Sequence, residues 1–397
     1  MAKKNYRVLC LGGGATNLTL MSGALHALNQ AGLHRNNNNN GPNIISMAGA
    51  GAVVGLHYLA PKGIKSHDRF SLEALENTIN IGVADEIFEM FPVNYKAFAK
   101  SGPSADLFNE FWYSLPEVQV TMHQSAMSDE EVLLSDALLF AGAMMCPTDL
   151  SFFSQGICGH SPFLEELIDF KALQSIDPND IEIEINAFNI EEKRVVDFTN
   201  YELDENGKPK LRDGKYIAKE ITVDHLRAAL SYPFLHPPYK IGNMHYFEGA
   251  AIQCLNDYFL SEAKIIEWIL VLDPLRKNMI GVPQNLWDAF ALSIIMPTAG
   301  LTELGQLILE FKNKFGDILP GIENLKSEID ADKKLSALEL IALAKNKLYL
   351  SEFNIPEKKV RAAWGWSRSN MKDLFRVGQE EGTRIAKKME LQGALHP

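Results

Sequence analysis

One short stretch of the sequence has the residue pattern of a catalytic turn. Asn43–Gly55 reads NIISMAGAGAVVG, in which an apolar segment leads into small residues around Gly49 and then into a second apolar segment. A strand, a sharp turn and a helix position the nucleophile in many hydrolases, and the same arrangement binds phosphate. The hydrolase version needs a serine in the middle of the turn, where this chain has Gly49. We therefore expect a hydrolase-like scaffold without the usual nucleophile.

A glycine turn comes before this stretch. Tyr6–Leu11 has the composition of a buried strand, Gly12, Gly13 and Gly14 follow it, and Leu18–Ala31 has apolar residues at helical spacing. Successive backbone N–H groups at the start of a helix bind anions and stabilise oxyanions. We therefore predict that the three glycines line an anion site.

A third small-residue turn lies late in the chain. Tyr246–Ala251 reads YFEGAA, which we interpret as a strand that ends at the Glu248-Gly249 pair. In open α/β sheets, ligand sites lie outside the carboxyl ends of the strands. The sequence therefore predicts that all three turns meet at one edge of a sheet.

These three turns together resemble the motifs of the patatin-like phospholipase family. That family has a GGGxxG oxyanion loop, a GxSxGA elbow and a late Asp-Gly pair that completes a Ser–Asp dyad. The matching segments here are GGGATN at residues 12–17, MAGAGA at residues 47–52 and MHYFEGAAIQ at residues 244–253. The closing WGWSRSNMKDLFRVGQEEG is similar to the tail of some bacterial members. The resemblance spans about residues 6–272 plus this tail, and it implies a lipid or fatty-acyl ligand.

The sequence departs from the family pattern at the positions that matter for catalysis. Gly49 replaces the nucleophilic Ser, Met47 the first Gly of the elbow, and Glu248 the dyad Asp. Asn17 replaces the last Gly of the oxyanion loop, and Thr16 a residue that is usually basic. Loss of the nucleophile lowers the kcat of a serine hydrolase by about six orders of magnitude. The resemblance therefore implies a member that no longer hydrolyses lipids, with Gly49 and Glu248 marking the former catalytic centre.

Other residues in the sequence can also act as nucleophiles or bases. For each of them we favour an ordinary structural role over a catalytic one: Ser46, Ser154, His160, Ser231, His236 and His245. The spacing of the four cysteines does not suggest a metal site. No metal or cofactor is predicted.

Three hypotheses for the function remain open. The first is a lipid-binding or regulatory protein on a patatin-like scaffold, and the second is a working lipid acyl hydrolase with a rearranged site. The third is an FAD- or NAD-binding oxidoreductase, because VLCLGGGATN resembles a GxGxxG turn. An acid should then end the second strand and hold the ribose, but Ser46 and Met47 stand there.

The order of patterns predicts an α/β fold with a mainly parallel sheet flanked by helices. We expect a patatin-like domain over residues 1–275 and a helical C-terminal extension over residues 276–397 that packs on it. The expected elements include helices within 70–127, over 222–230, 283–315, 336–348 and 371–389, and strands over 181–190, 194–200 and 265–272. The aromatic residues between Phe88 and Tyr113 are expected to pack inward or to line an acyl pocket.

Composition restricts the partners and the cellular compartment that we expect for this protein. The net charge of −12 argues against nucleic acid as a partner. The region from Leu301 onward is slightly basic, with 16 Lys and Arg against 14 Asp and Glu, so peripheral membrane contact is retained as a hypothesis. The cysteines read as reduced thiols, which predicts a cytoplasmic protein. We find no apolar run of the roughly 18 residues that a membrane span needs. The oligomeric state cannot be predicted.

Overall fold

A mixed sheet forms the centre of the molecule. The computed structural model describes residues 5–14, 17–33, 41–63, 72–122, 128–205, 208–260, 265–275, 279–283, 286–318, 347–353, 355 and 365–395. Within this part of the chain, the sheet runs in the order β10-β9-β1-β2-β3-β8-β7, and β4 pairs with β3. Its strands are β1 (Asn5–Leu11), β2 (Ile44–Met47), β3 (Glu182–Asn189), β4 (Arg194–Thr199), β7 (Tyr239–Ile241), β8 (Met244–Glu248), β9 (Ile265–Leu272) and β10 (Lys347–Leu350). A separate hairpin pairs β5 (Leu211–Arg212) with β6 (Lys215–Tyr216).

Five neighbouring strands are parallel, which confirms the predicted mainly parallel α/β fold. β10, β9, β1, β2 and β3 pair in parallel, while β4, β8 and β7 are antiparallel to their neighbours. Strands β1 and β9 lie in this parallel part of the sheet. Their apolar sequences fit this position, because parallel strands are usually covered on both faces.

The pairing of β3 explains how a late strand reaches the early turns. β4 pairs with β3 from Glu184 to Asn189 and so occupies one edge of β3 over this length. β2 pairs with Glu182–Ile185, and β8 pairs with Ala187–Asn189. Since each strand has only two edges, β8 must continue the edge of β3 where β2 stops. The end of β8 therefore lies just beyond the end of β2.

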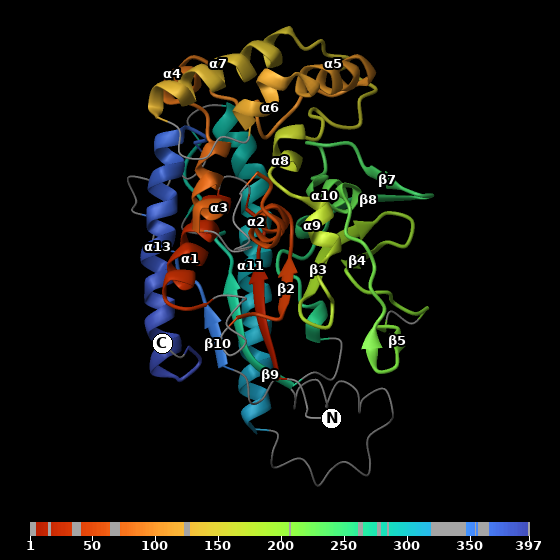
Figure 1. Ribbon diagram of the computed structural model, residues 1–397, viewed down its shortest axis with the longest axis vertical. Helices are drawn as coiled ribbons and strands as arrows, with labels where there is room; N and C mark the ends of the chain where they lie inside the picture. The colour runs from red at the N-terminus through yellow and green to blue at the C-terminus, as the bar shows by residue number, and fades with distance from the viewer. Residues whose placement is uncertain are drawn as a thin grey trace.

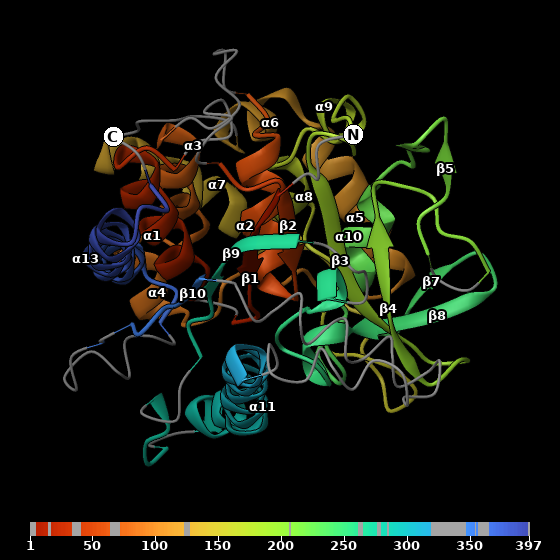
Figure 2. The same ribbon diagram turned by 90° about the horizontal axis from the view of Figure 1, so that it is seen from below.

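Helices cover both faces of the sheet. Figure 2 shows α2 on one side of the central strands and α11 on the other. The helices are α1 (Leu18–Gln30), α2 (Ala50–Leu59), α3 (Leu72–Asn77), α4 (Asp85–Met90), α5 (Pro103–Ser114), α6 (Pro116–Met122), α7 (Asp129–Met145), α8 (Pro162–Glu166), α9 (Phe170–Gln174), α10 (Val223–Leu230), α11 (Leu286–Ile318) and α13 (Arg368–Leu391). Short 3₁₀ turns occupy Thr78–Ile81, Gly249–Ala251 and Tyr258–Leu260.

Helices α1 and α13 pack side by side at unusually close range (Figure 1). A Cβ atom at Gly23 would overlap the carbonyl oxygen of Phe375, and one at Gly378 or Gly382 would overlap a carbonyl oxygen of α1. Only glycine permits this approach, because any side chain would force the two backbones apart. The GQEEG segment of the closing motif thus fixes α13 onto the first helix.

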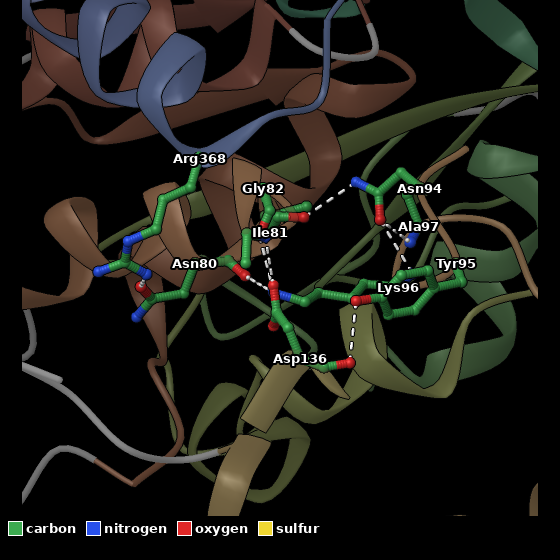
Figure 3. A network of polar contacts seen from close by, with 10 residues as sticks. Asn80, Ile81, Gly82, Asn94, Tyr95, Lys96, Ala97, Asp136 and Arg368 are labelled. Carbon is green, nitrogen blue, oxygen red and sulfur yellow. Dashed lines mark hydrogen bonds and ion pairs between the residues drawn. The ribbon is translucent and has the colours of Figure 1, made fainter. Parts of the chain in front are cut away.

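Helices α4 to α7 form a cap at one end of the molecule (Figure 1). A buried ion pair fastens α7 to the segment below it, with Lys96 Nζ 2.6 Å from Asp136 Oδ1. Lys96 also donates to the carbonyl oxygens of Asn80 and Gly82 (Figure 3). Asp136 accepts from the backbone N–H of Ala84. Both charges are therefore paired and hydrogen-bonded, as burial requires.

Two sequence predictions need correction in the C-terminal region. Of the helix predicted over 336–348, residues 336–346 lie outside the described residues, and Lys347 and Leu348 belong to strand β10. The region after residue 275 thus contributes a strand as well as helices, and the division at that residue stays a prediction. One helical segment, Ala291–Phe311 of α11, is long and apolar enough to cross a membrane by length and composition. Isolated polar residues interrupt this segment, so the sequence shows no unbroken apolar run there.

Candidate functional site

The first glycine turn follows β1 and borders a cavity. Gly13 and Gly14 line this cavity, whereas Gly12 lies against Asp273, whose Cγ would be 2.6 Å from a Cβ at Gly12. The N–H of Gly12 donates to the carbonyl oxygen of Leu272 at 3.0 Å. Among the described residues, the N–H groups of Gly13 and Gly14 donate to no backbone carbonyl. The role of all three glycines at an anion site stays a prediction.

The second turn has the geometry of a nucleophile elbow. Gly49 joins β2 to α2 with φ 50° and ψ −126°, a strained combination for any residue with a side chain. Helix α2 starts so close to β1 that a Cβ at Gly51 would overlap the carbonyl oxygen of Leu11. This close packing explains why the turn consists of small residues.

The third turn brings Glu248 to the same place. The N–H of Glu248 donates to the carbonyl oxygen of Ser231 at 2.9 Å, which ties the end of β8 to the end of α10. A Cβ at Gly49 would overlap Oε1 of Glu248 and lie 3.0 Å from its Cδ. The Glu248 carboxyl therefore fills the space in which a side chain at residue 49 would begin.

The three turns meet at one edge of the sheet, as predicted from the sequence. Glu248 reaches this edge differently from the two glycine turns, since β8 is antiparallel and continues along β3. Thr16 lies outside the described residues. Asn17 is fully buried at the start of α1, and its side-chain amide has no hydrogen-bond partner among the described residues.

A largely apolar cavity of about 160 Å³ opens beside Glu248. Burial raises the pKa of the Glu248 carboxyl to about 8. The cavity walls come from several elements, and most of the side chains are aliphatic or aromatic. The lining comprises Gly13, Gly14, Leu18, Ala50, Val53, Ala97, Phe98, His160, Ser161, Leu164, Leu230, Tyr232, Leu235, His236, Glu248, Ala250, Cys254, Leu275, Ala291, Ile294, Ile295, Thr298 and Trp366.

Two of the sequence candidates meet beside the cavity. Ser231 Oγ lies 3.1 Å from Nε2 of His160 and donates to the carbonyl oxygen of Arg227 at 2.8 Å. The rings of His160 and His236 stack with centroids 4.8 Å apart. Burial lowers the pKa of His236 to about 4, and burial together with His236 and Arg227 holds the pKa of His160 far below its usual range. Both imidazoles are therefore neutral near pH 7.

The remaining candidates lie elsewhere. Ser46 is fully buried and donates to the carbonyl oxygen of Asn256 at 3.2 Å. Ser154 is exposed and accepts from the N–H of Ser151, while His245 pairs with Glu191 at 2.7 Å. None of the three lines the cavity. Among the described residues, no group of His, Cys, Asp or Glu could hold a metal ion.

Several lining residues were not predicted from the sequence. Trp366 comes from the closing motif and packs edge-on against Phe98 at 5.9 Å between ring centroids. Ile294 and Ile295 come from α11, and Asp273 lies behind Gly12. The Asp-Pro pair directly after the β9 pattern was the one available signal for Asp273.

The fold and the site together define an α/β protein with the elbow and glycine loop of a lipid acyl hydrolase. A sequence model described as patatin-like phospholipase matches residues 9–254. This chain therefore belongs to the patatin-like phospholipase family, whose members are lipid acyl hydrolases.

The other comparisons add little. No curated protein matches the chain significantly. A crystal structure of VipD from Legionella pneumophila is similar at a TM-score of 0.36 and 11% identity, with 97% of this chain and 67% of that chain covered. A likeness this weak carries no argument about function.

Proposed function

We propose that this protein binds a lipid acyl group in the cavity and does not hydrolyse it. The overlap between the Glu248 carboxyl and the position of a side chain at residue 49 carries the proposal. Gly49 offers no hydroxyl to attack a carbonyl carbon, and Glu248 closes the space that a nucleophile would use. The elbow and glycine loop remain as a binding frame.

The size and lining of the cavity support an acyl ligand. Its volume of about 160 Å³ is close to that of an engineered cavity of about 150 Å³ that binds benzene. It therefore holds a headgroup with a short stretch of hydrocarbon. Burial of each CH₂ group from water contributes about 0.8 kcal/mol, which favours an acyl chain over a polar metabolite.

Hydrolysis of p-nitrophenyl octanoate by four proteins tests this proposal: the wild type, Gly49→Ser, Glu248→Asp and Gly49→Ser/Glu248→Asp. We expect the first three to be inactive, because Ser at residue 49 alone would collide with Glu248. The double variant removes one methylene and should gain activity. Turnover by purified wild type that survives repurification would overturn the proposal.

A rearranged hydrolase is the second candidate function, and the Ser231–His160 contact of 3.1 Å favours it. Ser231 is fully buried and also bonds Arg227, so it would have to rotate towards the cavity. Ester hydrolysis that disappears in Ser231→Ala and persists in Ser154→Ala would support this candidate. Family membership lends no support to the nucleotide-binding hypothesis.

Contact with a membrane is a further part of the proposal. Leu150, Phe152, Phe153 and Phe234 are exposed, and we call them the loop patch. The N–H of Ile157 donates to the carbonyl oxygens of Phe234 and Leu235, and Leu235 lines the cavity. Exposed apolar patches beside a lipid cavity suit a bilayer surface.

The proposed location of the protein is the cytoplasm. Cys10, Cys146, Cys158 and Cys254 are all free thiols, as is usual in a reducing compartment.

A further inference from the structure

Glu248 is the one carboxyl among the described residues that line the cavity. Its carboxyl makes no hydrogen bond or ion pair with the described part of the chain, and burial is the cause of its pKa near 8. A carboxyl in such surroundings keeps its proton near pH 7 and acts as a hydrogen-bond donor. The cavity therefore presents a hydrogen-bond donor in the space in which a side chain at residue 49 would begin.

Further donors border the same end of the cavity. Gly13 and Gly14 are lining residues whose N–H groups bond no described backbone carbonyl. A Cβ built on Gly13 would lie 3.9 Å from Oε1 of Glu248, so the glycine turn and the carboxyl are close neighbours. Two N–H groups and a carboxylic hydroxyl suit a ligand that accepts several hydrogen bonds.

We propose that the ligand is a free fatty acid whose carboxylate is held between the Gly13–Gly14 backbone and Glu248, with its chain in the apolar cavity. This inference rests on the proposed function. A carboxylate offers one oxygen to the N–H groups and the other to the Glu248 hydroxyl, and such charge-assisted bonds are about twice as strong as neutral ones. An ester has one strong acceptor oxygen, and an alkylammonium group has none. Both fit this set of donors less well.

The neighbouring groups with shifted pKa values titrate far from pH 8, whereas Glu248 titrates near it. Tyr232, two residues after α10, has a pKa raised to about 12, and the pKa of the Cys254 thiol is raised well above its usual range, both mainly by burial. His160 and His236 face the cavity with lowered pKa values. The Asp273 carboxyl lies behind Gly12. Ionisation of Glu248 would place two negative charges together and expel the fatty acid.

Calorimetric titration with eight-carbon probes tests the inference. Octanoate, octanol, methyl octanoate and octylamine would each be titrated into wild type, Glu248→Gln and the control Glu191→Gln, whose carboxyl pairs with His245 outside the cavity, between about pH 6.5 and 9.5. At low pH we expect octanoate to bind wild type at least about tenfold more tightly than the other probes. Its affinity should fall by up to about tenfold per pH unit above pH 8. The Glu191→Gln protein should show the same decline as wild type, and Glu248→Gln should bind octanoate without it.

The possible outcomes separate this inference from the proposed function. Equal binding of octanoate, octanol and methyl octanoate at every pH would overturn the inference and leave acyl binding intact. Tightest binding of octylamine would also overturn it, because Glu248 would then be ionised. Release of octanoate from methyl octanoate by wild type would overturn the proposed function itself. Failure of all four probes to bind would overturn both.

Discussion

Gly49 and Glu248 complement each other in volume. A side chain at residue 49 and the carboxyl of Glu248 would compete for one space. Because residue 49 is Gly, only the Glu248 carboxyl occupies that space. The long side chain of Glu248 therefore fits here because residue 49 is Gly. Reversal of one substitution alone should disturb the site more than reversal of both.

The raised pKa of the Glu248 carboxyl also has a consequence for stability. The pKa of Glu248 is about 8 in the folded protein, against an ordinary value of 4.5. Between these pH values the folded state holds a proton that the unfolded chain releases, so the free energy of unfolding falls as the pH rises. We expect the Tm of Glu248→Gln to rise relative to wild type from about pH 5 to about pH 8.

Thermal unfolding of the two proteins across this range measures the effect. The lowered pKa values of His160 and His236 act in the opposite direction below about pH 6.5. They affect both proteins alike and cancel in the difference. A constant Tm difference across the whole range would show that Glu248 is ionised throughout.

At the scale of residues, much of the site was predictable from the sequence. Glycine turns after apolar strands locate Gly12–Gly14 and Gly49, because backbone geometry at such turns restricts the residue type. The contact between Glu248 and Gly49 was not predictable, since it depends on β8 continuing along the edge of β3. The Ser231–His160 contact and Trp366 arise from tertiary packing that local patterns do not encode.

At the scale of elements, the Lys96–Asp136 pair holds the cap onto the body of the protein (Figure 3). Asp136→Asn leaves a buried ammonium group without its counter-charge, which typically costs about 3–5 kcal/mol. We expect a correspondingly lower free energy of unfolding, measured by urea denaturation, and partial recovery in Lys96→Met/Asp136→Leu.

The control is Lys62→Met, which removes a solvent-exposed pair with Glu166 and should cost about 1 kcal/mol or less. Equal effects of Asp136→Asn and Lys62→Met would contradict this assignment.

The contact between α1 and α13 gives a second prediction for an element. Gly23→Ala places a methyl group against the Phe375 carbonyl and should destabilise the protein by about 1–3 kcal/mol. Gly300→Ala in α11 has open space around it and should stabilise the helix by up to about 1 kcal/mol. Differential scanning calorimetry should therefore show Tm shifts of opposite sign. Shifts of the same sign would mean that the helices are not packed as described.

The elements that sequence patterns missed are those decided by tertiary pairing. Strand β10 is short, and it becomes a strand because the edge of β9 is available to it. Helix α11 was predicted correctly as a helix, but periodicity does not reveal that its first half lines a cavity. Long buried strands such as β9 were predicted well because their apolar composition alone specifies them.

At the scale of the whole molecule, exposed apolar side chains suggest how a lipid reaches the cavity. Phe152 and Phe153 are 97% and 89% exposed in the loop patch. We expect Phe152→Ser/Phe153→Ser to weaken binding to phosphatidylcholine vesicles by about tenfold or more in a sedimentation assay. The reason is that two aromatic rings inserted into the bilayer contribute several kcal/mol to binding. The control Leu211→Ser alters an exposed apolar residue of β5, which lies away from the cap (Figure 1). Identical vesicle binding by both variants would show that the loop patch does not contact the membrane.

The absence of a working nucleophile is the central claim, and covalent labelling tests it most directly. Wild type would be incubated with a fluorophosphonate probe, and its intact mass and labelled peptides would be determined beside those of Gly49→Ser/Glu248→Asp. We predict no adduct on wild type and a single adduct at residue 49 of the double variant. A stoichiometric adduct on a serine of wild type, Ser231 above all, would contradict the claim and make this protein a hydrolase with a rearranged site.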